Sequence, residues 1–253
     1  MTDNRHNWHK LAGTTPLVVV LLFLSTLASA IEPKEIVLKS DEYRQPFREM
    51  KIVSRLTSFR DNKMAKEGFY DVFIKGDRAL VVVMRGAEKG QKVLMLNGSF
   101  WMRFPSSGRA IRITPMQRLM GDASYGDLGK ISWSNDYKAV FHPEGKESKV
   151  GESPVLRLLL TSRTTSATYD KIELWVDKHN YQPLQADYYL SSGKHFKRAL
   201  FGTPRQKNGR PIIMETTFVD ILNTKNRTIM EFEDIKETRI DDRLFNLTLF
   251  SDK

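Results

Sequence analysis

Hydrophobic and polar residues alternate along the second half of the chain in the way that is typical of β-strands. One such segment alternates apolar Ile172, Leu174 and Val176 with acidic residues at positions 173 and 177. Another alternates Met230 and Phe232 with glutamates at 231 and 233. Side chains two residues apart lie on the same face of a strand, so each segment has one apolar and one polar face. The pattern predicts antiparallel sheet with one face toward solvent.

Strands earlier in the chain are predicted to be apolar on both faces. Residues 80–84, 93–96 and 158–160 are uninterrupted runs of Leu, Val and Met. A second apolar face has to be covered. The cover is either a helical part of the chain, with residues 33–45 and 115–130 as candidates, or a bound apolar ligand. The pattern leaves both alternatives open.

Turn signals join these strands into hairpins. The strongest short hairpin signal in the sequence is Asn97-Gly98, which lies between predicted strands at residues 92–96 and 99–104. A second predicted turn, residues 75–78, joins strands at 69–74 and 79–84. Further strands are predicted from residue 50 onward and at residues 109–114, 137–141, 155–162, 169–177, 184–190, 194–201, 212–222 and 228–238. Because parallel neighbours need crossovers of a dozen or more residues, these short links predict about eleven antiparallel strands.

Three segments are predicted to be helical. Pro33 suits a first helical turn and Pro46 ends the pattern, which predicts a helix over residues 33–45. Residues 115–130 are predicted to form a helical turn, a glycine-rich loop and a second turn. An aspartate at 241 or 242 is expected to cap a last turn that ends at residue 245. Residues 142–152 are predicted to be a polar loop.

The first thirty residues have the features of a secretory signal. Arg5 and Lys10 give a positive start, residues 17–27 are almost wholly apolar, and Ala28-Ser29-Ala30 matches a cleavage site before Ile31. An uncleaved anchor is the alternative, but the run is shorter than the roughly 20 residues that span a bilayer. Because no cysteine follows, no lipid is attached there. We therefore expect a soluble, exported protein with one domain, residues 31–253.

Composition narrows the possible chemistry. The 253 residues contain no cysteine, which excludes disulfides, thiolate metal sites and cysteine nucleophiles. The formal charge of +10 favours acidic partners such as anionic lipid headgroups, or serves solubility alone. Nucleic acid is a poor candidate outside the cytoplasm.

Catalytic motifs are scarce. His142, His179 and His195 are not at metal-ligand spacing and are predicted to lie on the surface. We expect no metal and no cofactor. A cluster of Asp122, Ser124, Tyr125 and Asp127 is the best catalytic candidate, either as a carboxylate pair of a hydrolase or as helix-capping residues.

A segment that combines arginines with large apolar residues is the more informative candidate. Guanidinium groups suit an anionic headgroup, and flexible methionines suit a hydrocarbon chain; ordinary core and surface roles are the alternative. The headgroup or partner candidates are Arg103, Arg109, Arg112 and Arg118. The candidates for an apolar cavity and its lid are Trp101, Phe104, Met116, Leu119, Met120, Leu158 and Leu160.

Several motifs together resemble the LolA-like outer-membrane lipoprotein-sorting proteins. They are LMGDASYGDL at residues 119–128, LWVD at 174–177, PLQADYY at 183–189 and IDDRLF at 240–245. The resemblance implies a mainly β (α+β) fold, an incomplete antiparallel barrel of about eleven strands with helices covering the open concave side. It also implies an apolar cavity for acyl chains.

The expected function follows from this resemblance. We expect a monomeric, non-enzymatic periplasmic carrier or chaperone that binds lipoproteins or membrane lipids for outer-membrane sorting and works with an inner-membrane transporter complex. Two alternatives remain: a non-carrier partner subunit of an inner-membrane export system, and a hydrolase that uses residues 122–127.

Overall fold

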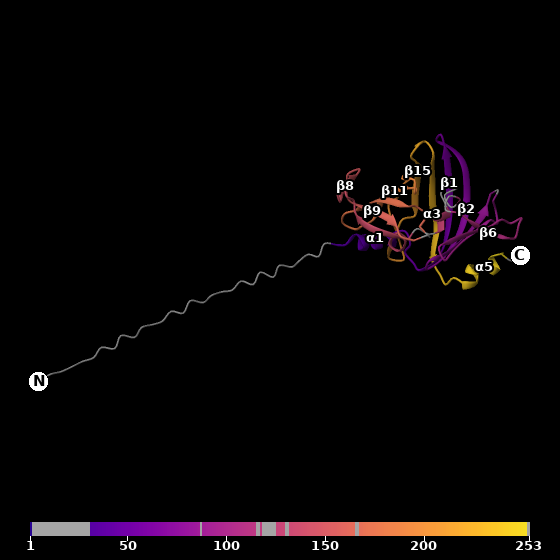
Figure 1. The fold of residues 1–253 in the computed structure, drawn as a ribbon, viewed down its shortest axis with the longest axis horizontal. Helices are drawn as coiled ribbons and strands as arrows, with labels where there is room; N and C mark the ends of the chain where they lie inside the picture. The colour runs from indigo at the N-terminus through magenta and orange to yellow at the C-terminus, as the bar shows by residue number, and fades with distance from the viewer. Residues whose placement is uncertain are drawn as a thin grey trace. The chain divides into compact units, whose positions relative to one another are not determined.

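The computed structural model describes residues 1, 31–86, 88–114, 117, 125–129, 132–164 and 167–251 (Figure 1). The chain divides into two units, Met1–Ala30 and Ile31–Lys253, and the fold is that of the second unit. The expected signal segment is residues 1–30, and all of it except Met1 lies outside the described residues.

One large antiparallel sheet dominates the fold. Its strands follow the order β6-β5-β4-β3-β2-β1-β16-β15-β12-β11-β10-β9-β7, with β8 paired to β9 as well. The long strands are β1 (Glu49–Arg60), β2 (Lys63–Lys75), β3 (Arg78–Arg85), β9 (Ser153–Ser162), β10 (Lys171–Asp177), β11 (Pro183–Tyr189), β12 (His195–Phe201), β15 (Glu215–Asp220) and β16 (Arg227–Glu237). The short ones are β4 (Lys92–Leu96), β5 (Ser99–Arg103), β6 (Ala110–Ile113), β7 (Tyr137–Phe141) and β8 (Glu147–Val150). β13 (Arg205–Lys207) and β14 (Arg210–Ile212) form a separate hairpin.

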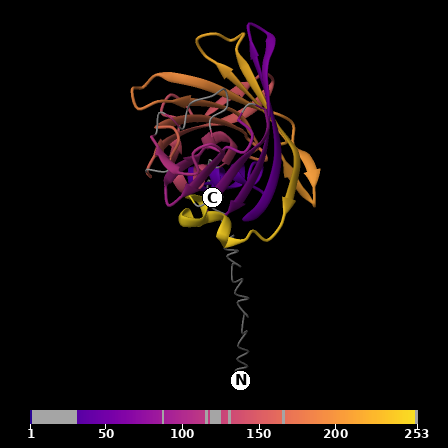
Figure 2. The same cartoon turned by 90° about the vertical axis from the view of Figure 1, so that its right-hand side faces the viewer.

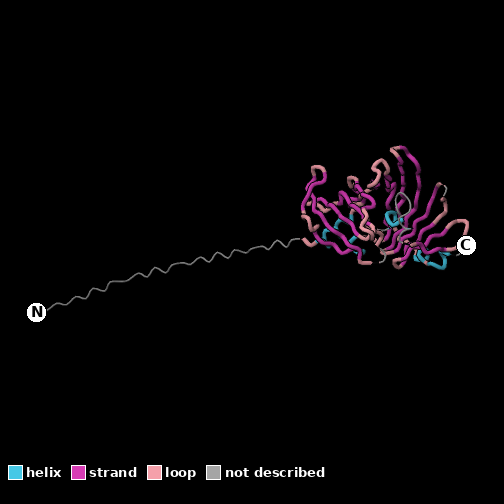
Figure 3. The backbone as a smooth tube through the Cα atoms, turned by 45° about the horizontal axis from the view of Figure 1, so that its top comes forward, coloured by secondary structure: helices cyan, strands magenta, loops and turns pink. Residues whose placement is uncertain are grey.

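The sheet curves around an interior but does not close, since β6 and β7, at its two ends, do not pair in the described part of the chain (Figures 2 and 3). This confirms the expected incomplete antiparallel barrel. The described residues contain sixteen strands rather than about eleven.

Short helices fill or flank the curve of the sheet. They are α1 (Pro33–Glu42), α3 (Tyr125–Gly129), α4 (Trp133–Asp136), the 3-10 turn η1 (Asp242–Phe245) and α5 (Leu247–Ser251). α1 packs against α4 and β7, and α3 packs against β2 and β3. η1 and α5 pack instead against β3, β4 and β6.

The Asn97-Gly98 signal gives the hairpin that it predicts. Both residues have positive φ, 50° and 70°, as a two-residue type I′ turn requires. β4 and β5 are joined there in the register Leu96 to Ser99.

Two hydrophobic clusters explain why the early strands are apolar on both faces. Val81 and Val93 belong to the inner core, together with most of the buried residues. Leu80 and Leu94 belong to an outer cluster with Ile240, Phe245 and Phe250. The C-terminal segment therefore covers the outer face, whereas residues 33–45 and 115–130 were the candidate covers in the sequence.

Other elements differ from their expected bounds for identifiable reasons. The helix that begins at Pro33 ends at Glu42, after which the carbonyl of Asp41 accepts hydrogen bonds from the N–H groups of Arg44 and Gln45. The expected strand over residues 212–222 is interrupted because the N–H of Ile213 donates to the carbonyl of Tyr43. The expected loop over residues 142–152 contains β8, which pairs with β9.

Candidate functional site

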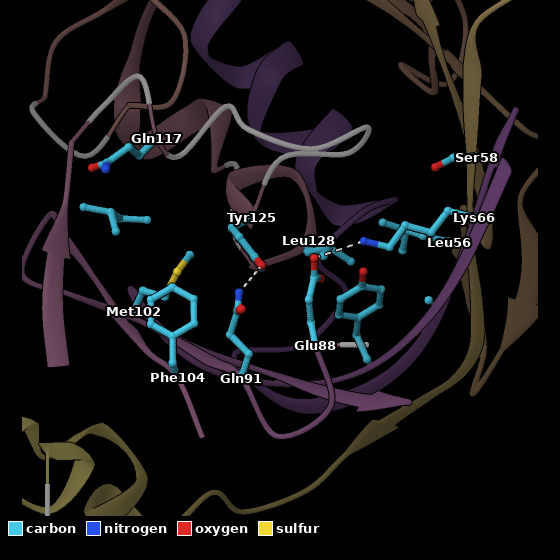
Figure 4. A pocket seen from close by; sticks show the side chains of 13 residues that line it. Leu56, Ser58, Lys66, Glu88, Gln91, Met102, Phe104, Gln117, Tyr125 and Leu128 are labelled. Carbon is cyan, nitrogen blue, oxygen red and sulfur yellow. Dashed lines mark hydrogen bonds and ion pairs between the residues drawn. The ribbon is translucent and has the colours of Figure 1, made fainter. Parts of the chain in front are cut away.

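The concave side of the sheet contains a cavity of about 380 Å³, here called the inner pocket (Figure 4). Its walls come from β1, β2, β5, β6, the β3–β4 turn and α3. The lining residues are Leu56, Ser58, Lys66, Gly68, Tyr70, Glu88, Gln91, Met102, Phe104, Ile113, Gln117, Tyr125 and Leu128.

Strand alternation places the apolar side chains of this pocket. Leu56 and Ser58 lie two residues apart on β1, on the buried side of its regular burial pattern. On β5, Met102 packs against the inner core while its neighbour Trp101 packs against the outer cluster. Figure 4 shows Met102 and Phe104 on one side of the pocket and Leu56 on the other. The pocket thus has opposed apolar walls.

Polar groups gather at one part of the same pocket. Lys66 Nζ lies 3.2 Å from Glu88 Oε1, and both side chains are about half exposed. Gln91 donates a short hydrogen bond to the Tyr125 hydroxyl, which joins α3 to the strand side of the pocket (Figure 4). Burial, followed by the charge of Glu88, raises the pKa of Tyr125 well above its usual 10.0, so this phenol stays neutral. The inner pocket therefore combines an apolar interior with a polar border.

A buried ion pair fixes α3 inside the sheet. The ammonium of Lys197 on β12 pairs closely with the carboxylate of Asp127, whose side chain is fully buried. The Tyr169 hydroxyl donates to Asp127 at 3.0 Å. Burial lowers the pKa of Lys197, and the charge of Asp127 opposes that shift.

The two glycines of α3 allow it to approach its neighbours closely. A Cβ atom at Gly126 would overlap the side chain of Thr168, and one at Gly129 would overlap Met95. The helix therefore sits in contact with both β3–β4 and the segment before β10.

The candidate cavity residues lie in three places. Phe104 lines the inner pocket, and Leu158 and Leu160 are fully buried in the inner core on β9. Trp101 lies on the outer face, among residues that pack against the C-terminal cluster. Met116, Leu119 and Met120 lie outside the described residues.

The three described candidate arginines, Arg103, Arg109 and Arg112, do not line the inner pocket. Arg103 donates to the carbonyl of Gly108 at 3.2 Å, and Arg112 donates to the Ser99 hydroxyl at 3.0 Å. By alternation with Met102, both belong to the same face of the sheet as Trp101. Arg109 is exposed, and Arg118 lies outside the described residues.

The candidate catalytic cluster is only partly described. Asp122 and Ser124 lie outside the described residues, and Asp127 is held in the buried pair with Lys197. This environment makes Asp127 a structural anchor of α3.

One expectation about the histidines is wrong. His142 is buried, with 8% of its surface exposed, because it follows β7 and its ring packs 3.8 Å from Glu173. His195 is partly buried beside Asp187, and His179 is exposed.

Several pocket residues carried a signal that sequence reasoning missed. Leu56 and Ser58 continue the alternation of Met50, Ile52 and Ser54 along β1, which marks one face of a buried strand. A serine on that face is polar among apolar neighbours and so marks a polar patch in the interior. Glu88 and Gln91, in the β3–β4 turn, carry no such pattern.

The described residues contain neither a metal-binding cluster nor a membrane-spanning helix. No three His, Cys, Asp or Glu side chains among them are arranged to hold a metal ion. None of the helices described is both long and apolar enough to cross a membrane.

Comparisons with known proteins place the fold. A family model with the description "-like: Uncharacterized protein" matches residues 75–251, and the chain belongs to that family. A LolA superfamily protein from Nitrosomonas europaea superposes with a TM-score of 0.77 at 25% identity, over 86% of this chain and 98% of that one. The chain has a LolA-like fold. This confirms the resemblance found in the sequence.

Two further structures share this LolA-like fold. A putative outer membrane lipoprotein-sorting protein domain from Vibrio parahaemolyticus has a TM-score of 0.71 at 16% identity, covering 87% of this chain and 98% of its own. A DUF1329 family protein from Desulfovibrio piger has a TM-score of 0.70 at 17% identity, covering 87% of this chain and 100% of its own. No curated protein matches the chain.

Proposed function

We propose that this LolA-like protein is a periplasmic, non-enzymatic carrier that holds acyl chains of lipoproteins or membrane lipids in the inner pocket. The observation that carries the proposal is a cavity of about 380 Å³ with opposed apolar walls and a polar border. This volume lies in the range of small-molecule sites, which are apolar with a few polar groups that orient the ligand.

Burial of hydrocarbon supplies the binding energy. Each methylene group removed from water contributes about 0.8 kcal/mol, so a chain of several methylenes is held without any strong polar contact. Leu56, Met102, Phe104 and Leu128 supply the apolar contact, and the polar border with Lys66 and Glu88 faces the headgroup end. We further propose that Leu158 and Leu160, which are buried in the inner core, and the sequence candidates Met116, Leu119 and Met120 contribute to acyl-chain binding.

The wider setting is part of the same proposal. Residues 1–30 direct export and are removed after Ala30, and residues 31–253 act as one monomeric domain. The similarity in fold to a putative lipoprotein-sorting domain supports lipoproteins or lipids as cargo. An inner-membrane transporter complex is the proposed partner.

A fluorescent fatty-acyl probe tests the proposal. Phe104 is 39% exposed and lines the pocket, so Phe104→Ser should leave the fold intact and remove apolar contact. Complete burial of such a side chain is worth about 1.5–3 kcal/mol, so partial loss predicts an affinity reduced by about fivefold to tenfold.

Val140→Ser is the matched control. Val140 is 42% exposed and does not line the inner pocket. Its substitution should leave probe affinity unchanged. If folded wild-type protein takes up no probe, the carrier proposal fails; if it also co-purifies with a membrane complex, the partner-subunit alternative is favoured.

A further inference from the structure

A second pocket, of about 180 Å³, lies where three turns of the sheet meet, and we call it the basic pocket. Arg60 is the last residue of β1 and Arg227 the first of β16, whereas Lys194 lies in the β11–β12 turn and Leu222 in the β15–β16 turn. Its floor includes Lys197 and Phe218, which belong to the concave side of the sheet.

Hydrogen bonds between two of these turns give the pocket a fixed wall. The N–H of Asn62 donates to the carbonyl of Lys225 at 3.1 Å, and the N–H of Asp61 donates to Asn226 Oδ1 at 3.2 Å. Arg227 donates to Asn62 Oδ1 at 2.6 Å. The β1–β2 and β15–β16 turns therefore form one unit, and they lie side by side in Figure 2.

The basic pocket adjoins the inner pocket. Ser58 lines the inner pocket, Thr228 lines the basic pocket, and their hydroxyl oxygens lie 3.2 Å apart. The two linings therefore touch at this pair of side chains on the β1–β16 wall. One molecule of amphiphile size can therefore contact both pockets.

Positive charge exceeds negative charge in the basic pocket. Four of its lining residues are cations, Arg60, Lys194, Lys197 and Arg227, and the single carboxylate is Asp220. Asp220 already accepts hydrogen bonds from the N–H groups of two turn residues, Leu222 at 2.8 Å and residue 223 at 3.3 Å. Asp127 neutralises Lys197. Lys194 and Arg227 then contribute two positive charges against the one carboxylate of Asp220.

Arg227 is held in place for recognition of an anion. Its guanidinium lies 4.4 Å from the centre of the Phe59 ring and is bound to Asn62. A guanidinium fixed in this way loses little freedom when its other N–H groups bind the oxygens of a phosphate or carboxylate.

Apolar groups share the pocket with these cations. Phe196 and Phe218 line it, and Leu222 is 76% exposed at its border. A small hydrophilic anion makes no use of this surface, whereas an anionic headgroup attached to hydrocarbon does.

We propose that the basic pocket binds the anionic headgroup, a phosphate or carboxylate, of the amphiphile whose hydrocarbon occupies the inner pocket. This proposal rests on the proposed function, because it assigns the headgroup class of the same ligand. Among the sequence candidates for the headgroup, Arg103, Arg109 and Arg112 lie on or between β5 and β6, and Arg118 lies outside the described residues. The geometry points to Lys194 and Arg227 instead.

Calorimetric titration of the exported protein with three probes tests the proposal. Dihexanoyl phosphatidylglycerol is an anionic lipid, dihexanoyl phosphatidylcholine carries the same chains on a zwitterionic headgroup, and glycerol 3-phosphate carries no chain. The variants are Lys194→Gln and Arg227→Gln. Lys149→Gln, an exposed lysine on β8 outside both pockets, is the control.

We expect phosphatidylglycerol to bind more tightly than phosphatidylcholine. Each of the two variants should weaken phosphatidylglycerol about fivefold, because one cation near an anionic lipid contributes a factor of about that size. Neither variant should change the affinity for phosphatidylcholine, and Lys149→Gln should change the affinity for neither lipid. Equal binding of both lipids, or wild-type affinity for phosphatidylglycerol in both variants, would refute the assignment of the basic pocket as the headgroup site. Either result would leave the proposed function unaffected.

The remaining outcomes separate the two proposals. If neither lipid binds to folded protein, the proposed function fails and the headgroup assignment fails with it. If glycerol 3-phosphate binds as tightly as phosphatidylglycerol and depends on Lys194 and Arg227, the anion site stands and its lipid source is refuted.

Discussion

The buried pair of Asp127 and Lys197 gives the sharpest prediction about how α3 is held. The Asp127 side chain is fully buried and the Lys197 side chain is 7% exposed. Removing one partner of such a pair leaves the other charge buried without compensation, which typically costs about 3–5 kcal/mol. We expect Lys197→Met to lower the free energy of unfolding by about 3 kcal/mol, because the Tyr169 hydroxyl still stabilises the carboxylate.

The opposite substitution should cost less. Lys197 lines the basic pocket, so in Asp127→Leu its long side chain can turn toward water. The double variant Lys197→Met with Asp127→Leu replaces the pair by apolar side chains, which is often close to neutral. It should therefore be more stable than Lys197→Met alone, with a coupling energy of about 2 kcal/mol or more.

Urea unfolding followed by tryptophan fluorescence measures all four corners of this cycle. The exposed pair of Lys178 and Glu147, 2.8 Å apart, is the control, and its cycle should show a far smaller coupling. Additive effects of the two substitutions at Asp127 and Lys197, within about 0.5 kcal/mol, would refute the reasoning, because independent sites behave in that way.

Two further predictions concern the C-terminal segment. Phe250→Ala should lower the free energy of unfolding by about 3 kcal/mol, because this ring is only 6% exposed and packs in the outer cluster. Leu249→Ala, at a residue that is 51% exposed, should change the free energy of unfolding little. Thermal unfolding compares the two variants, and equal losses of stability would contradict this packing. Hydrogen bonds from Lys75, and then Arg78, hold the pKa of Asp242 below its usual 3.8. The folded state therefore binds this proton less tightly than the unfolded state, so the stabilisation is present above pH 3.8 and is lost as pH falls through the folded pKa. The melting temperature of Asp242→Asn should consequently fall less steeply below pH 4 than that of the wild type, and parallel pH profiles would count against the ion pairs.

Local patterns in the sequence predict most of the sheet. Asn97-Gly98 fixes a turn with positive φ at both residues, and the strands on either side follow from it. The strand over residues 137–141 has the same bounds in the structure. Such elements are predictable because turn chemistry and alternation are local properties of the chain.

Pairing between distant segments could not be predicted in the same way. The cover over Leu80 and Leu94 comes from Phe245 and Phe250, more than 150 residues later, and no local pattern shows which segment packs there. The interruption at Ile213 has the same origin, since its hydrogen-bond partner is Tyr43.

The candidate site was only partly predictable for a related reason. Phe104 and Trp101 are both large apolar residues in one segment, yet alternation on β5 and beyond puts one at the pocket and the other under the C-terminal cluster. The basic pocket gathers Arg60 from the end of β1, Lys194 from the β11–β12 turn and Arg227 from the start of β16, so it exists only once the sheet has formed.

The central claim is that hydrocarbon occupies the inner pocket, and photocrosslinking tests it most directly. A fatty acid with a diazirine near its methyl end would be irradiated with the protein, and the labelled residues identified by mass spectrometry of peptides. Labelling concentrated at Met102, Phe104 and Leu128, and suppressed by excess unlabelled fatty acid, is the predicted result. Labelling confined to the outer cluster around Trp101 and Phe250, or spread evenly over exposed side chains, would contradict the account.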